Sequence, residues 1–298
     1  MTRGVDEMAT PGPDVLGFEA MQVQIELDRK KRIAEHKQAV VAKGVARLTL
    51  EARGGGVPLN ILAEGDSWFD YPLSRDTIGW IKANGTPRPL MLNLSHYGDV
   101  ATQMLGVTQR QRIIENLSDP ENGTFDALLF SGGGNDIAGD QFCLWVNQFV
   151  EGTDPVYGID RQRLADMIGV INAAFVDLIQ VRDAIALGCV IFMHAYDFAQ
   201  PTGQGVCGIG PWLKPSLDFR GWIDPTLAAQ IVKEVLLLLD RLLAQIEQRN
   251  TNVIYIRTQG TLAPDFDWSN ELHPTEQGFG KIGDVFLRSL RTKFPGRI

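Results

Sequence analysis

Short apolar runs alternate with helical segments over most of this chain. The runs are short enough to be strands buried on both faces of a sheet. They lie at Leu59–Ala63, Leu90–Leu94, Ala127–Phe130, Cys189–His194 and Val253–Ile256. Between them, helical periodicity runs over Arg75–Ala83, Val100–Asn116, Arg161–Ala186, Thr226–Arg249 and a last segment after His273. This alternation predicts βαβ units around a five-stranded parallel sheet.

The segment after Asp224 gives the clearest helical signal. Asp224 can cap the helix and Pro225 suits its first turn. Apolar residues then repeat at helical spacing, at Leu236, Leu239, Leu243 and Ile246. We therefore expect one long amphipathic helix here.

The first 56 residues do not follow this alternation. Residues 1–16 show no periodicity and predict a flexible tail, and residues 17–56 predict a helical extension. We place its apolar face at Met21, Ile25, Ile33, Val40, Val41 and Val45, and its basic face at Arg29, Lys30, Lys31, Arg32 and Lys37. We interpret the basic face as solvated, with an anchor to an anionic surface as the alternative.

Two long stretches fit neither pattern, Gly139–Asp160 and Asp197–Ile223. Long loops in a compact domain are usually binding loops or lids. Each follows a predicted strand, so each could rim a crevice at the carboxyl edge of the sheet, where open parallel sheets bind ligands.

Composition narrows the function classes. The chain has 28 Lys and Arg against 36 Asp and Glu, a net charge of −8, which argues against nucleic acid as a partner. The longest uninterrupted apolar runs, Cys189–Met193 and Val235–Leu239, are five residues each, so we expect no transmembrane helix. The N-terminus has no apolar signal region, so we expect a cytoplasmic protein.

Three cysteines, Cys143, Cys189 and Cys207, are too few and too scattered for a disulfide framework or a zinc cluster. We interpret them as buried filler residues. Gly203 to Gly208 matches a dinucleotide-binding fingerprint, but neither a strand before it nor a helix after it is predicted. We therefore reject a nucleotide site there.

Polar residues gather where the strands end. The first strand runs into Gly65-Asp66-Ser67, a turn that can expose a nucleophilic hydroxyl, although Gly-Asp-Ser is also a common turn and cap sequence. The third strand ends in three glycines followed by Asn135, whose amide could donate to an oxyanion.

Two further segments complete the set. The second strand leads to Gly98, whose backbone N–H is another candidate donor, and His273 lies on the loop after the last strand, with Pro274 expected in the first turn of the following helix. Several aromatic residues could wall a substrate pocket, or else lie in the core: Trp68, Phe69, Tyr71, Trp212 and Trp222. For His194, Tyr196 and Asp197 we leave open pocket lining and plain packing.

These four segments, in this order, resemble the SGNH hydrolases, also called GDSL lipases and esterases. The resemblance covers the chain from about Leu59 to the C-terminus. It implies a flavodoxin-like three-layer α/β/α sandwich over residues 57–298, with the N-terminal helical extension added. It also favours the catalytic reading of Ser67 over the turn reading.

The resemblance implies a role for each matching position. Ser67 would be the nucleophile and His273 the general base. The oxyanion donors would be the backbone N–H groups of Ser67 and Gly98 and the side chain of Asn135. The implied reaction is hydrolysis of a carboxylic ester, lipid or carbohydrate esters included, through an acyl-enzyme, and it needs no metal or organic cofactor.

One position departs from the family. Asn270 stands three residues before His273, where the family has aspartate. In a serine protease, Asp-to-Asn in this role lowers kcat roughly 10⁴-fold. Either Asn270 orients the imidazole as a neutral group, or Asp267 or Asp265 replaces it, or the chain is a weakened variant. The alternatives to an esterase are therefore an acyltransferase on the same scaffold and a ligand-binding protein with decayed catalysis.

Overall fold

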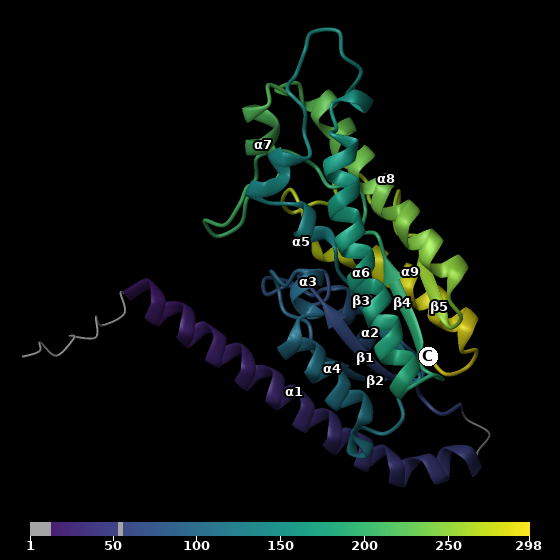
Figure 1. Ribbon diagram of the computed structural model, residues 1–298. Coiled ribbons are helices and arrows are strands. Elements are labelled where there is room, and N and C mark those ends of the chain that lie inside the picture. The colour runs from purple at the N-terminus through teal and green to yellow at the C-terminus, as the bar shows by residue number, and fades with distance from the viewer. Residues whose placement is uncertain (1–12, 53–55) are drawn as a thin grey trace, which may run out of the picture.

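The computed structural model describes the backbone of residues 13–52 and 56–298, and side chains of residues 20–44 and 56–298. The flexible tail expected over residues 1–16 lies mostly outside the described residues. The helical elements, strands and their order are shown in Figure 1.

The five strands form one parallel sheet in the order β2-β1-β3-β4-β5, which confirms the expected flavodoxin-like architecture. Their bounds are β1 Asn60–Gly65, β2 Leu90–Asn93, β3 Ala127–Ser131, β4 Val190–His194 and β5 Val253–Ile256. Every residue of β1, β3 and β4 is buried. Those three strands are covered on both faces, which is why they read as continuous apolar runs.

Helices cover both faces of the sheet (Figure 1). On one face α2 (Thr77–Asn84) packs against α9 (Glu276–Lys293), and on the other α6 (Arg161–Ile185) packs between α4 (Val107–Ser118) and α8 (Pro225–Arg249). Apart from the N-terminal helix, the remaining elements are short: α3 Ala101–Met104, α5 Gly134–Ile137, α7 Lys214–Phe219, and 3₁₀ turns η1 Pro120–Asn122, η2 Asp140–Leu144 and η3 Pro155–Tyr157.

Two helix boundaries differ from the prediction. The single helix expected over 100–116 is two helices, because Gly106 has extended backbone (ψ 167°) that cannot continue α3 and instead caps α4. Helix α9 begins at Glu276 with Thr275 as its cap, so Pro274 precedes the helix. The start of α8 is as expected, since the Asp224 carboxylate accepts from the N–H groups of Thr226 and Leu227.

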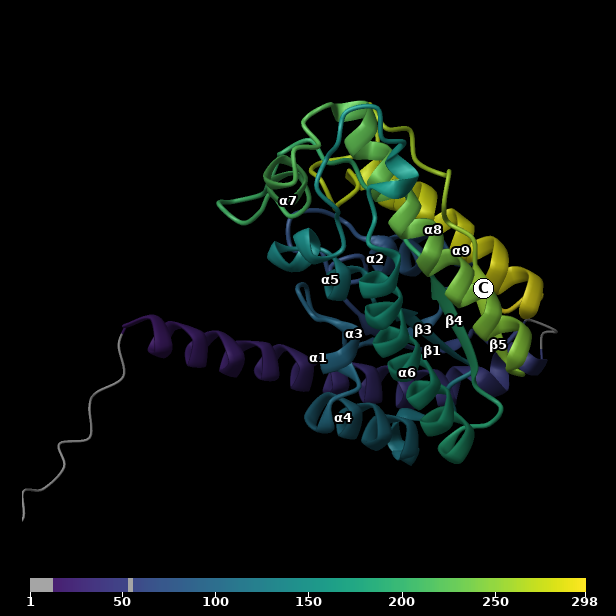
Figure 2. The same ribbon diagram turned by 45° about the horizontal axis from the view of Figure 1, so that its top comes forward.

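The N-terminal helix α1 (Pro13–Ala52) lies along the edge strand β2. Its N-terminal part extends beyond the rest of the domain in both views (Figures 1 and 2). The predicted faces are partly wrong: Ile25 is buried as expected, but Arg29 and His36 are buried too, and Met21 and Val41 are exposed. Arg29 and His36 are buried although they are basic, because each pairs with polar groups of the domain. Hydropathy alone could not reveal these pairings. The side chain of Val45 lies outside the described residues.

Helix α6 is long and apolar enough to cross a membrane by length and composition. Short uninterrupted apolar runs therefore do not exclude such a segment. In the structure α6 packs against α3, α4 and α8 over the sheet, which accounts for the apolar residues of its buried face.

Candidate active site

The four predicted segments meet at the carboxyl edge of the sheet. Gly65 at the end of β1 is paired with Ser131 at the end of β3, which sets the turn carrying Ser67 beside the turn carrying Asn135. A single pocket is lined by Ser67, Gly98, Asn135 and His273. The topology thus brings together residues from four separate parts of the chain.

Ser67 and His273 form the central contact. The Ser67 Oγ lies 2.7 Å from His273 Nε2, and His273 Nδ1 lies 2.9 Å from Asn270 Oδ1. A hydroxyl, an imidazole and an amide thus lie in a hydrogen-bonded series, the arrangement expected of a nucleophile, a base and an orienting group.

The orientation of the Asn270 amide fixes the tautomer of His273. Asn270 Oδ1 also accepts from the backbone N–H groups of Leu272 and His273, at 3.1 and 3.0 Å. An N–H group can only donate, so the amide must present its oxygen there. His273 Nδ1 therefore carries the hydrogen, and the unprotonated Nε2 faces the Ser67 hydroxyl.

The aspartates considered as replacements are engaged elsewhere. The buried Asp267 carboxylate accepts from Lys281 Nζ at 2.6 and 2.8 Å and from the Ala263 N–H at 2.7 Å. Asp265 is exposed. Of the three candidate partners, Asn270 is the one whose side chain contacts the imidazole, and Asp267 braces the loop before it.

Burial lowers the pKa of His273 to about 4. The ring of Tyr71 stacks on the imidazole at 4.7 Å and the ring of Trp212 meets it edge-on at 5.5 Å, so little water reaches it. Asn270 supplies no negative charge to offset this desolvation. The imidazole is consequently neutral near pH 7 and able to accept a proton.

Three N–H donors are available beside the Ser67 hydroxyl. Within the ranges the structure describes, the backbone N–H groups of Ser67 and Gly98 donate to no protein acceptor. Asn135 uses one amide hydrogen on the backbone oxygen of Asp99, at 2.9 Å, and retains the other. Gly98 has φ +83°, which an L side chain rarely adopts, so glycine is needed for this turn.

A buried polar network beneath Ser67 was missed from the sequence. Asp66 accepts from Tyr196 Oη at 2.5 Å, from Ser131 Oγ at 2.9 Å and from the Trp68 N–H at 3.0 Å. His194 Nε2 lies 2.9 Å from Ser131 Oγ. The network ties the turn carrying Ser67 to the ends of β3 and β4. Its sequence signal was the polar residues that end those strands, including His194, which packs here and does not line a pocket.

The basic face of α1 is also part of the site's support. Arg29 donates to the Leu94 backbone oxygen at 2.8 Å and to the Asp99 carboxylate at 2.7 Å. Arg32 donates to the Ser95 backbone oxygen and to both oxygens of Asp70. The interpretation of these arginines as a solvated face is wrong. They hold the segment that carries Gly98.

Glu271, next to Asn270, was likewise missed. Its fully buried carboxylate accepts from four backbone N–H groups at 2.5–3.0 Å, those of Gly203, Trp212, Leu213 and Lys214. Glu271 thus joins the loop bearing His273 to the long loop 197–223. A lone Glu beside the motif gave no signal of this role.

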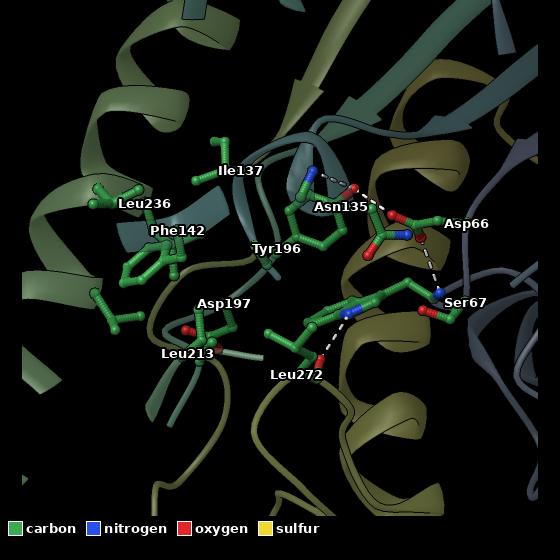
Figure 3. A pocket seen from close by; sticks show the side chains of 16 residues that line it. Asp66, Ser67, Asn135, Ile137, Phe142, Tyr196, Asp197, Leu213, Leu236 and Leu272 are labelled. Atoms are coloured by element: carbon green, nitrogen blue, oxygen red, sulfur yellow. Dashed lines mark hydrogen bonds between the residues drawn. The ribbon is translucent and has the colours of Figure 1, made fainter. Parts of the chain in front are cut away.

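Two pockets meet at Ser67. The inner pocket, about 50 Å³, runs from Ser67 and Asn135 at one end to Ile137, Phe142 and Leu236 at the other (Figure 3). The outer pocket, about 250 Å³, is lined by Tyr97, Ile209 and Trp212 among others. Phe142 comes from one long loop and Ile209 and Trp212 from the other, so the expectation that these loops rim the site is confirmed.

The remaining sequence candidates divide between core and pocket. Trp68, Tyr71, Trp212, Tyr196 and Asp197 line the two pockets. Phe69 and Trp222 are buried in the core. Cys189 is buried as expected, but Cys207 is exposed on the outer pocket and Cys143 is half-buried, so the filler interpretation is wrong for Cys207.

No family model and no curated protein matches this chain. Solved structures do. A lipase from a goat rumen metagenome matches with a TM-score of 0.51 and 14% identity, over 78% of this chain and 96% of that one. A carbohydrate acetylesterase from Sinorhizobium meliloti matches at 0.49 and 12%, over 79% and 100%. A candidate GDSL-like lipase from Parabacteroides merdae matches at 0.45 and 16%, over 79% and 96%.

At these identities the likeness is one of fold. The chain shares the fold of the goat rumen lipase, which agrees with the fold that the four segments implied.

Proposed function

We propose that this protein is a serine hydrolase that cleaves carboxylic esters through an acyl-enzyme. The contact of 2.7 Å between Ser67 Oγ and His273 Nε2 carries the proposal, because it pairs a hydroxyl with an unprotonated base beside unused N–H donors. The fold, shared with a lipase, supports the same class of chemistry.

The reaction proceeds in two halves. His273 Nε2 takes the Ser67 proton as Oγ attacks the ester carbonyl, and the N–H groups of Ser67, Gly98 and Asn135 stabilise the resulting oxyanion. The tetrahedral intermediate collapses, the C–O bond to the alcohol breaks, and Nε2 returns its proton to the leaving oxygen. A water activated by His273 then attacks the acyl-Ser67 ester and releases the acid.

Asn270 orients His273 in this scheme without stabilising the imidazolium by charge. We therefore expect a slower enzyme than one with a carboxylate at that position. This same observation motivates the second candidate, a ligand-binding protein on a hydrolase scaffold.

The test compares the parent with Ser67→Ala. The parent should hydrolyse short p-nitrophenyl esters and be labelled at Ser67 by a fluorophosphonate probe, while Ser67→Ala should fold normally and lose both. Unchanged ester hydrolysis by a folded Ser67→Ala protein overturns the proposal. A parent inert to both esters and probe supports the binding protein instead.

A further inference from the structure

Ser67 lies between two pockets of unlike size, as described above. Ser67, Asn135 and Leu272 line both pockets, so an ester carbonyl held at the N–H donors would extend one substituent into each. The two pockets therefore receive the two halves of the substrate.

His273 decides which half enters which pocket. It lines the outer pocket and is absent from the lining of the inner one. Its Nε2 must deliver a proton to the alcohol oxygen as that oxygen leaves. Building on the proposed function, we propose that the alcohol occupies the outer pocket and that the inner pocket is an acyl pocket that selects short acyl chains over long ones.

The size of the inner pocket sets this preference. The space that it offers, about 50 Å³, is a fifth of the 250 Å³ of the outer pocket. Ile137, Phe142 and Leu236 close its far end (Figure 3). Ile137 and Phe142 are at most 4% exposed, so the wall is well packed and a longer chain would have to displace it.

The inner pocket is also unsuited to polar acyl groups. Two carboxylates lie in its wall, but Asp66 is saturated by the polar network beneath Ser67. Asp197 accepts from the backbone N–H groups of Phe198, Gly260 and Leu262, each at 2.7 Å. The other walls are mainly aliphatic and aromatic, so an uncharged, short alkyl chain fits best.

The outer pocket differs in size and lining. It is about five times larger by volume, about 250 against about 50 Å³, and Tyr71, Tyr97 and Trp212 contribute flat faces. Aromatic walls of this kind stack on rings and apolar faces. The preferred substrate is thus a short-chain acyl ester of a larger alcohol.

The experiment measures kcat/KM for p-nitrophenyl acetate, butyrate and octanoate. The parent should lose at least tenfold between butyrate and octanoate. Leu236→Ala widens the inner pocket and should raise the octanoate-to-acetate ratio about tenfold or more. The matched control Leu243→Ala removes a buried leucine from the same helix away from both pockets, and should leave the ratio unchanged.

Two further variants keep the test decisive if Leu236→Ala does not fold. Ala138→Val narrows the inner pocket and should reduce butyrate hydrolysis more than acetate hydrolysis. Ile209→Ala, exposed on the outer pocket, should change KM for 2-naphthyl acetate without altering the acyl-length ratio.

Failure of this assignment is separable from failure of the proposed function. Ser67-dependent hydrolysis with equal rates on acetate and octanoate overturns the acyl pocket and leaves the esterase intact. Equal acyl-length ratios in Leu236→Ala, Leu243→Ala and the parent also overturn it. Absence of any Ser67-dependent ester hydrolysis overturns both.

Discussion

The amide oxygen of Asn270 lies 2.9 Å from His273 Nδ1 and accepts two backbone N–H groups besides. Asn270 thus keeps the hydrogen-bonding geometry of an orienting carboxylate but carries no negative charge. Its other amide atom, Nδ2, lies 3.3 Å from Tyr71 Oη, a group that could equally donate to a carboxylate oxygen. An aspartate would therefore fit without rearrangement.

Asn270→Asp should raise kcat by about tenfold or more, because the carboxylate stabilises the imidazolium formed during reaction. It should also raise the pKa of His273 above its present value of about 4. Since the base is lost on protonation, the acidic limb of kcat/KM should move to higher pH. The pH profile of both proteins measures this. A lower rate with an unmoved limb would contradict the orienting role of Asn270.

Arg29→Lys should lower kcat about tenfold with little change in KM. Arg29 bonds the Leu94 oxygen and Asp99 through two separate nitrogens, and the single ammonium of lysine does not reproduce that spacing, so the segment carrying Gly98 and the oxygen that holds Asn135 lose their fixed position. Steady-state kinetics and the rate of fluorophosphonate labelling measure the effect. Lys31→Ala, exposed on the same helix, is the control. Equal kcat in both variants would show that Arg29 acts on stability alone.

Glu271→Ala should destabilise the fold by about 3 kcal/mol, because four backbone N–H groups lose a buried acceptor. Urea denaturation measures the loss. The loop 197–223 should also become susceptible to limited proteolysis. Glu151→Ala, on an exposed position of the other long loop, should change neither. Resistance of the loop to protease in the Glu271→Ala protein would argue against its tethering role.

Glu64 should make the protein less stable as pH rises. Burial raises its pKa from about 4.5 to about 7, opposed by the charge of Arg29, and one carboxylate oxygen, Oε2, has no hydrogen-bond partner. With the folded pKa above the unfolded one, its stabilising contribution is complete below pH 4.5 and is lost as pH rises through 7.

Glu64→Gln removes this titration. Relative to the parent, its free energy of unfolding should rise by up to about 3 kcal/mol between pH 4.5 and 8, at about 1.4 kcal/mol for each unit of pKa. Urea denaturation at both pH values gives the difference. Glu35→Gln, exposed on α1, should follow the parent. A constant difference between Glu64→Gln and parent would show that Glu64 does not titrate in this range.

The sheet was predictable because its strands are largely buried and stand out as apolar runs, and the predicted bounds of β5 match the observed ones. Ser67, Gly98, Asn135 and His273 were found because each ends or follows a strand. The supporting residues were not. Asp66 and Tyr196 are 130 positions apart, and a pairing at such separation leaves no local pattern.

The predicted faces of α1 were partly wrong for a related reason. Arg29 is buried because Asp99 and the Leu94 carbonyl satisfy it, and hydropathy counts a guanidinium as solvent-facing whatever its partners. Glu271 is buried for the same reason, because backbone N–H groups satisfy its carboxylate.

Helix α1 leaves the ribosome before any of the groups it docks on. Leu94, Asp99, Arg112, which pairs with Glu26, and Glu121, which pairs with Lys37, are all synthesised later. Its long-range contacts must therefore wait for β2 and the chain beyond it, and such distant contacts form slowly. Helix α1 is thus made before the groups that seat it, and the segment carrying Gly98 is held in place only once both have been synthesised.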